Sequence, residues 1–155
     1  MGAYQSVLKR LGHTRGFRFV FKRTLPKIDR VVSRMTGGKR TFAQTLVPTF
    51  VLVHTGRKTG REFRSPLSYV EVGDGFALAA TNWGQDKHPL WSGNLIANPE
   101  AEVVVGGETI PVRARHVSED EKAELWPQFV DMWPAYNTYV KRSGRNIRVF
   151  VLERR

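Results

Sequence analysis

The sequence predicts an α+β fold with a mainly antiparallel sheet, and three observations support this class. Short apolar stretches are joined by tight glycine-containing turns, as in β-hairpins. One helical segment is inserted between the third and fourth expected strands, and another precedes the last strand. Long crossover segments, which parallel strands require, are scarce. Six short strands around one interior favour a small barrel with flanking helices, and the 155 residues suit one core.

Three strands are expected in the first half of the sheet. An apolar run at 49–54 and an alternating run at 64–70 flank a turn that is bounded by two glycines, so they should form a hairpin. The Gly-Asp-Gly at 73–75 is a second turn signal. A third strand should therefore cover residues 76–81, and a polar loop follows at 82–88.

The next expected elements are a helix and a second hairpin. Residues 89–98 begin with a proline in the first turn and end at Asn-Pro, which is typical of a short helix. Strands are expected at 102–105 and 109–117, because both flank a Gly-Gly turn. The insertion of this helix between two hairpins is what makes the predicted class α+β and not all-β.

The C-terminal part should be a helical region followed by one strand. Residues 118–121 form a capping box, which indicates that a helix begins there. The helical pattern continues to about residue 140, with interruptions expected at Pro127 and Pro134. An alternating stretch at 146–152 is the last expected strand.

The positive charge is concentrated in an N-terminal extension, which we assign to residues 1–45, before a domain at 46–155. Residues 1–40 hold eleven Lys and Arg and one acid, whereas residues 41–155 have a net charge of +1. Residues 17–35 form a basic amphipathic pattern. This pattern is typical of a helix docked on the domain, and it also fits peripheral contact with an anionic membrane. Nucleic-acid binding is disfavoured, because the domain itself is nearly neutral.

Several classes of site are disfavoured by the sequence. Cysteine is absent, the four histidines lack metal-binding spacing, and no metal site is expected. Nucleophile-elbow, Walker and dinucleotide-binding motifs are also absent. The sequence has no apolar run of the roughly 20 residues that span a membrane and no recognisable signal peptide. We therefore expect a cytoplasmic protein, with a location at the inner face of the cell membrane left open.

The turn at 56–61 and the following strand are the first candidate site. Arg57, Lys58, Arg61 and Arg64 could hold phosphate or carboxylate groups, although a solvated charged turn is the alternative. A second candidate is an aromatic series on the expected C-terminal helix. Its members are Trp126, Phe129, Trp133, Tyr136 and Tyr139. Phe129 should be core, whereas the tyrosines could line a pocket. An anion site with aromatic walls and no nucleophile suggests binding of a flat, phosphorylated cofactor.

Three motifs give the chain a resemblance to a known family. They are residues 55–60 with 65–67, residues 86–99, and the Trp-Pro and Tyr positions at 126–139. Their order and spacing over about 47–153 resemble the deazaflavin-dependent nitroreductase family of actinobacteria. The resemblance implies a split β-barrel and an oxidoreductase. It further implies coenzyme F420, a hydride carrier with a phosphate and an oligoglutamate tail. The implied acceptors are quinones, including menaquinone-like ones, or nitroaromatic compounds.

The resemblance also implies roles for individual residues. Arg57, Lys58 and Thr59 would contact the phosphate and tail, with Arg64 nearby, and Ser65, Pro66 and Leu67 would line the ring. The remaining cofactor contacts would be Ala79, Ala80, Thr81, Asn82, Leu90, Trp91, Asn94 and Tyr136. Trp133, Tyr136 and Tyr139 would face the substrate. Tyr136, Tyr139 and Thr81 are the catalytic candidates, with either tyrosine or solvent orienting or protonating the acceptor.

Three residues depart from the family pattern, and two alternatives remain. Phe63 stands where the family usually has arginine, and Thr81 and Trp133 replace a serine and a tyrosine of one characterised type. Arg61 or Arg64 could substitute from neighbouring positions. A non-catalytic carrier of deazaflavin, FMN or a lipid-like ligand would use the same scaffold. FMN is the less favoured cofactor, although the turn would also suit its phosphate.

Overall fold

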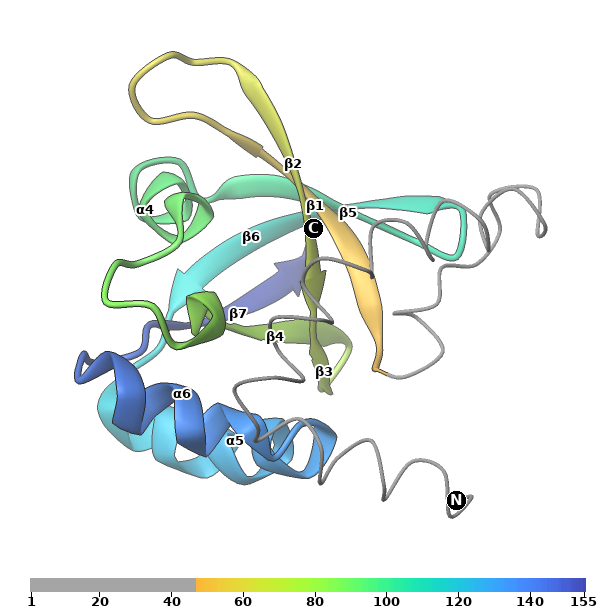
Figure 1. Cartoon of the computed structure of the whole chain (residues 1–155). Helices are drawn as coiled ribbons and strands as arrows, with labels where there is room; N and C mark the ends of the chain where they lie inside the picture. The colour runs from red at the N-terminus through yellow and green to blue at the C-terminus, as the bar shows by residue number, and fades with distance from the viewer. Residues whose placement is uncertain (1–46) are drawn as a thin grey trace, which may run out of the picture.

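The computed structural model describes residues 47–155 (Figure 1). The expected helix within residues 17–35, the basic extension and the domain boundary after residue 45 lie outside the described residues. Within 47–155, none of the helices combines the length and the apolar character needed to cross a bilayer.

Within residues 47–155, seven strands form one antiparallel sheet, which confirms the predicted class. The strands are β1 (Thr49–Thr55), β2 (Glu62–Ser68), β3 (Val70–Val72), β4 (Gly75–Ala79), β5 (Glu100–Val105), β6 (Glu108–His116) and β7 (Val149–Arg154). Their order across the sheet is β2-β1-β5-β6-β7-β4-β3. Every neighbouring pair is antiparallel. The sheet curls on itself as a half-barrel (Figure 1).

The single strand expected at 64–70 is in fact two, and this break explains the seventh strand. β2 and β3 are separated only by Tyr69, yet they lie at opposite edges of the sheet. The Tyr69 N–H donates to the carbonyl of Pro48 (3.2 Å), and its ring stacks on Phe50 with centroids 4.8 Å apart. The chain therefore bends at Tyr69 and carries the sheet around its interior. Alternation continues through the bend, so the sequence pattern shows no interruption there.

The interior of the curled sheet is the main hydrophobic core. Phe50, Leu52, Val103 and Phe150 are fully buried there. Helix α4 (Leu90–Ala97) covers one end and contributes Trp91 and Leu95 to the same cluster. The expected helix at 89–98 is thus confirmed, and it brings its aromatic side chain next to β7.

Two further helices, α5 (Glu119–Met132) and α6 (Ala135–Ser143), lie together on the outside of the sheet (Figure 1). Ser118 accepts from the Glu121 N–H, which confirms the cap. The interruption predicted at Pro127 is wrong, since this proline lies within α5. Pro127 and Ala123 are both exposed, so water can satisfy the carbonyl that loses its helical partner. The break at Pro134 is confirmed, and the last strand begins at Val149, later than expected.

Candidate functional site

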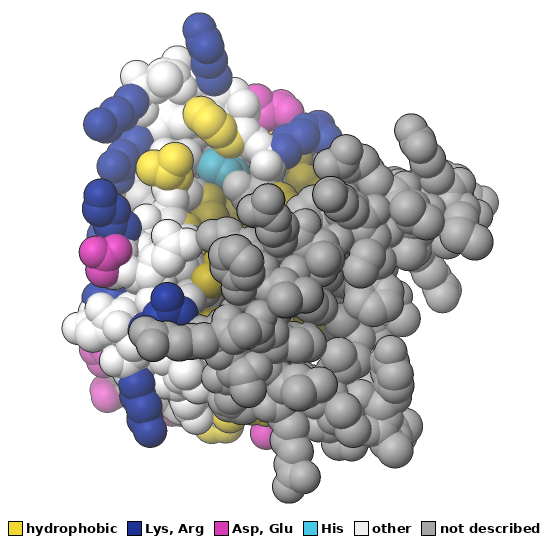
Figure 2. Space-filling model, viewed as in Figure 1, with side chains coloured by type: hydrophobic (Ala, Val, Ile, Leu, Met, Phe, Trp, Pro, Cys, Tyr) yellow, Lys and Arg dark blue, Asp and Glu magenta, His cyan; other side chains and the backbone are white. Residues whose placement is uncertain are grey.

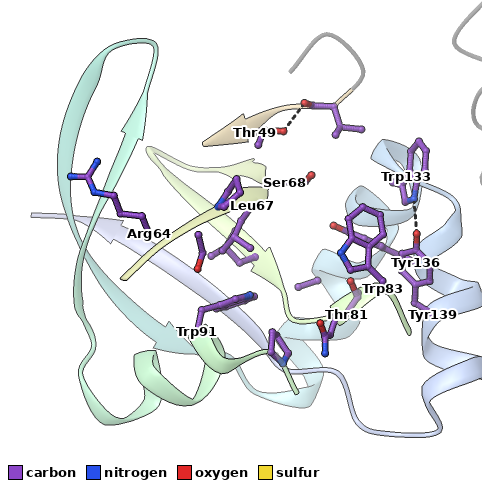
Figure 3. Close-up of a pocket in the computed structure, with 17 residues that line it drawn as sticks. Thr49, Arg64, Leu67, Ser68, Thr81, Trp83, Trp91, Trp133, Tyr136 and Tyr139 are labelled. Carbon is purple, nitrogen blue, oxygen red and sulfur yellow. Dashed lines mark hydrogen bonds between the residues drawn. The ribbon is translucent and has the colours of Figure 1, made fainter. Parts of the chain in front are cut away.

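A cavity of about 490 Å³ opens between β2, the end of β4, the start of α4 and helix α6 (Figure 3). Eleven of the residues expected at the site line it: Arg64, Ser65, Pro66, Leu67, Ala79, Thr81, Asn82, Trp91, Trp133, Tyr136 and Tyr139. The other lining residues are Val47, Thr49, Ser68, Leu78, Trp83 and Pro89. The volume lies within the usual range for small-molecule sites, which is roughly 300–1,000 Å³.

Strand β2 forms one wall, and its register decides which side chains share a face. Phe63 is opposite His54 on β1, and Arg64 is opposite Val53. Neighbouring strand residues project to opposite faces. Phe63 therefore stacks on the His54 ring (centroids 5.9 Å apart), whereas Arg64 pairs with Glu62 at 3.0 Å. The Arg64 side chain therefore projects from the other face of β2 than residue 63 does. It does not take the place that an arginine at position 63 would have.

The opposite wall is aromatic. Trp133 Nε1–H donates to Tyr139 Oη at 3.3 Å, and the Tyr136 and Tyr139 rings lie 6.0 Å apart. Phe129, on α5, is fully buried behind them, as expected for a core residue. Burial raises the pKa of Tyr136, and the nearby Tyr139 adds to this effect. Tyr136 is therefore a neutral phenol that can donate a hydrogen bond at neutral pH.

Trp83 completes the aromatic wall, a role that the sequence did not assign to it. It lies in the short 3₁₀ turn η1 (Asn82–Gly84), where three consecutive residues have φ of +46°, +57° and +73°. Two of them are not glycine, and such backbone strain is concentrated at functional sites in proteins. Trp83 is 54% exposed at the cavity (Figure 3), and its ring makes an edge contact with the Tyr139 ring, with centroids 6.3 Å apart. The sequence indicated only a polar loop here.

A second missed residue, Arg145, fixes the loop that carries Trp83. Its guanidinium donates to the carbonyls of Ala80 (3.0 Å), Thr81 (2.7 Å) and Gln85 (3.0 Å). It also lies 3.0 Å from His88 Nδ1. These partners are 57 to 65 positions away in the sequence, so local pattern could not reveal them. Arg145 therefore holds the loop between β4 and α4 in the shape that forms the cavity wall.

The cationic turn, residues 56–61, lies at the tip of the β1–β2 hairpin, outside the cavity. Backbone bonds from Gly56 N to Arg61 O and from Gly60 N to Gly56 O, both 2.8 Å, close it. Among the described residues, Arg57, Lys58 and Arg61 take part in no ion pair. Basic side chains gather over this end of the molecule (Figure 2). The turn is thus a preformed surface with uncompensated positive charge.

Helix α4 joins the turn to the cavity. A Cβ at Gly93 would overlap the Arg57 guanidinium, so the arginine packs directly on the helix backbone. The Arg57 N–H also donates to Asn94 Oδ1 at 3.1 Å. Like Asn94, two further expected contacts do not line the cavity: Leu90 is 77% exposed on α4, and Ala80 is fully buried with its N–H donating to the Arg148 carbonyl.

Comparison with known proteins identifies close sequence and structural relatives. The sequence model of the family described as F420H(2)-dependent quinone reductase matches residues 26–154. The F420H(2)-dependent quinone reductase Rv1261c of Mycobacterium tuberculosis is 34% identical over 136 residues, covering 84% of this chain and 91% of the relative. A second protein of that species, Rv3178, is 37% identical over 109 residues, covering 70% and 92%. A solved F420-H2 dependent reductase, FDR-A, superposes with a TM-score of 0.63 at 34% identity, covering 68% and 94%.

Proposed function

The chain belongs to the family of F420H(2)-dependent quinone reductases, and from this premise we propose that it reduces a quinone-like acceptor. It is an oxidoreductase of the split-barrel type with coenzyme F420 as its cofactor. We place the coenzyme along β2, between the cationic turn and the cavity. The observation that carries this placement is that one strand, β2, begins beside the turn and continues into the cavity wall.

The residues present fit such a cofactor at both ends. The cavity offers aromatic and aliphatic walls on several sides, which suit a flat ring system. The turn offers Arg57 and Lys58 without acidic partners among the described residues, which suits a phosphate and an acidic tail. Thr59 contributes a hydroxyl that already accepts from the Arg61 N–H at 3.3 Å.

The proposed cofactor contacts follow this division. Arg57, Lys58 and Thr59 bind the phosphate and tail, and Ser65, Pro66 and Leu67 line the ring. Further contacts come from residues that close the cavity: Arg64, Ala79, Thr81, Asn82, Trp91 and Tyr136. Ala80, Leu90 and Asn94 do not line the cavity, and they stay proposed cofactor contacts on the strength of the family resemblance alone.

When bound, reduced F420 supplies a hydride, and reduction of a quinone to a hydroquinone needs that hydride and a proton. In our proposal the acceptor lies between the coenzyme ring and the wall formed by Trp83, Trp133 and Tyr136. These rings exclude water and hold a flat molecule in position. Tyr136 donates a hydrogen bond to an acceptor oxygen. Because burial raises its pKa, Tyr136 retains its proton, and solvent supplies the proton that is consumed.

Two further proposals concern a second class of acceptor and a membrane contact that would supply a lipophilic acceptor. A nitroaromatic compound is the second acceptor class that the aromatic wall could hold, and it competes with the quinone in the same assay. Residues 1–40 have a net charge of +10. If they contact an anionic membrane, they would bring the enzyme to a lipophilic quinone. Removal of these residues should abolish association with anionic liposomes and preserve F420 binding. Unchanged liposome association would refute the membrane contact.

The test of the proposed function has two steps. Titration of F420 with the full chain should give a saturable fluorescence change, and excess FMN should not displace the coenzyme. Oxidation of reduced F420 should then require both the protein and a quinone. Saturable binding without quinone-dependent oxidation would favour a non-catalytic carrier, and the absence of saturable binding would refute both.

A further inference from the structure

Three hydrogen bonds connect the cationic turn to the cavity. The Arg57 N–H donates to Asn94 Oδ1 (3.1 Å), Asn94 Nδ2 lies 3.2 Å from His54 Nδ1, and His54 Nε2 lies 3.1 Å from Ser65 Oγ. We call this chain of contacts the His54 relay. It begins at the backbone of the turn and ends at a side chain that lines the cavity.

The chemistry of the groups determines the direction of each bond. A backbone N–H can only donate, so the oxygen of the Asn94 amide must face Arg57 and its amino group must face His54. That amino group also can only donate, so His54 Nδ1 accepts and carries no proton. The proton of the neutral ring is therefore on Nε2, and Nε2–H donates to Ser65 Oγ.

The surroundings of His54 maintain this arrangement. His54 is 4% exposed and Asn94 is 7% exposed, and the Phe63 ring stacks on the imidazole at an interplanar angle of 17°. Burial lowers the pKa of His54, so the ring is neutral at neutral pH. A protonated ring would direct a second N–H at the Asn94 amino group, which cannot accept it.

Ser65 has one hydroxyl hydrogen, and the relay does not use it, because Ser65 acts there as an acceptor. We propose that His54 is a positioning residue, which orients Ser65 so that its hydroxyl donates a hydrogen bond to an oxygen or nitrogen on the bound deazaflavin ring. Asn94 connects this orientation to the turn that grips the tail. The inference rests on the proposed placement of the coenzyme ring along β2.

Two substitutions of His54 each keep one of its two hydrogen bonds in the relay and remove the other. In His54→Gln the amide nitrogen lies about where Nε2 was and can still donate to Ser65. In His54→Asn the shorter side chain can still bond to Asn94 but not reach Ser65. We expect His54→Gln to bind F420 within about twofold of wild type, and His54→Asn to bind about three- to tenfold more weakly. His116→Asn, on the exposed side of β6, is the matched control and should not change the affinity.

A double-mutant cycle tests whether His54 acts through Ser65. Ser65→Ala should weaken F420 binding as much as His54→Asn does, and the double variant should be no weaker than Ser65→Ala alone. Losses that multiply, or equal losses for His54→Gln and His54→Asn, would overturn the inference. Wild-type chain that shows no saturable binding would overturn the proposed function as well, so the two failures are distinguishable.

A direct observation of the ring does not depend on the folding of any variant. Nitrogen NMR of the wild-type chain with labelled histidine should show a neutral His54 that is protonated at Nε2 and unprotonated at Nδ1. A proton on Nδ1 would reverse the bond to Asn94 and overturn the relay.

Discussion

The cationic turn and the aromatic cavity are two ends of one proposed site, and they are built in different ways. The turn consists of consecutive residues, closed by two backbone hydrogen bonds, with its cations in water. The cavity draws on β2, β4, α4 and α6, and several of its side chains, among them Tyr136 and Tyr139, are buried. Substitutions in the turn should therefore change ligand affinity without changing stability, whereas substitutions that shape the cavity should change stability.

The largest effect should come from Arg145→Ala. The change removes the guanidinium donor from the carbonyls of Ala80, Thr81 and Gln85, of which Thr81 still accepts from the Gly84 N–H, and we expect a loss of about 2–4 kcal/mol in the free energy of unfolding. Denaturant titration measures this loss. Arg142→Ala, at an exposed position near the end of α6, three residues before Arg145, is the control. A loss below about 0.5 kcal/mol, the usual scatter for surface changes, would mean that Arg145 does not hold the cavity wall.

A turn substitution, Lys58→Ala, should have the opposite profile. We expect the dissociation constant for F420 to rise about three- to tenfold, since one charge-assisted contact is lost, while the free energy of unfolding stays unchanged. The effect should shrink as salt is added. Lys141→Ala, also exposed but next to a different groove, is the matched control. Equal affinities for Lys58→Ala and wild type would remove Lys58 from the site.

Trp83 tests whether the aromatic wall serves the acceptor. Trp83→Ala should raise KM for the quinone about two- to tenfold, because a ring contact is lost, and should leave F420 affinity unchanged. Trp83→Gly should have the same KM as Trp83→Ala. Its free energy of unfolding should be higher than that of Trp83→Ala, since glycine adopts the positive φ of +57° without strain. An unchanged KM in both variants would exclude Trp83 from acceptor binding.

Mild acid should lower the free energy of unfolding, because two partly or fully buried histidines resist protonation in the folded chain. Burial lowers the pKa of both His54 and His88, and nearby Arg148 and Arg145 lower that of His88 further. Below about pH 6.5 the unfolded chain takes up protons that the folded chain resists, so stability should fall with decreasing pH. Unfolding measured between pH 5 and 8 should show a shallower dependence in His54→Gln. An identical dependence would mean that His54 does not contribute.

Much of this architecture could be predicted from the sequence, and the failures have physical reasons. The β1–β2 hairpin, α4 and the cap at Ser118 depend on local signals, and all were predicted. The bend at Tyr69 was missed, because alternation continues through it. Arg145 and His54 were missed as well, since their partners are distant in the sequence. The part that Trp83 has in the aromatic wall was missed, because no sequence rule places a tryptophan at positive φ.

In our proposal the turn and the cavity bind two parts of one coenzyme. The most direct test compares F420 with the same deazaflavin lacking its phosphate and tail, in wild type and in the triple variant Arg57→Ala/Lys58→Ala/Arg61→Ala. Wild type should bind complete F420 much more tightly than the truncated molecule. The triple variant should lose most of this preference and bind the truncated molecule as well as wild type does. A preference that survives in the triple variant, or an equal loss of affinity for both molecules, would contradict the account.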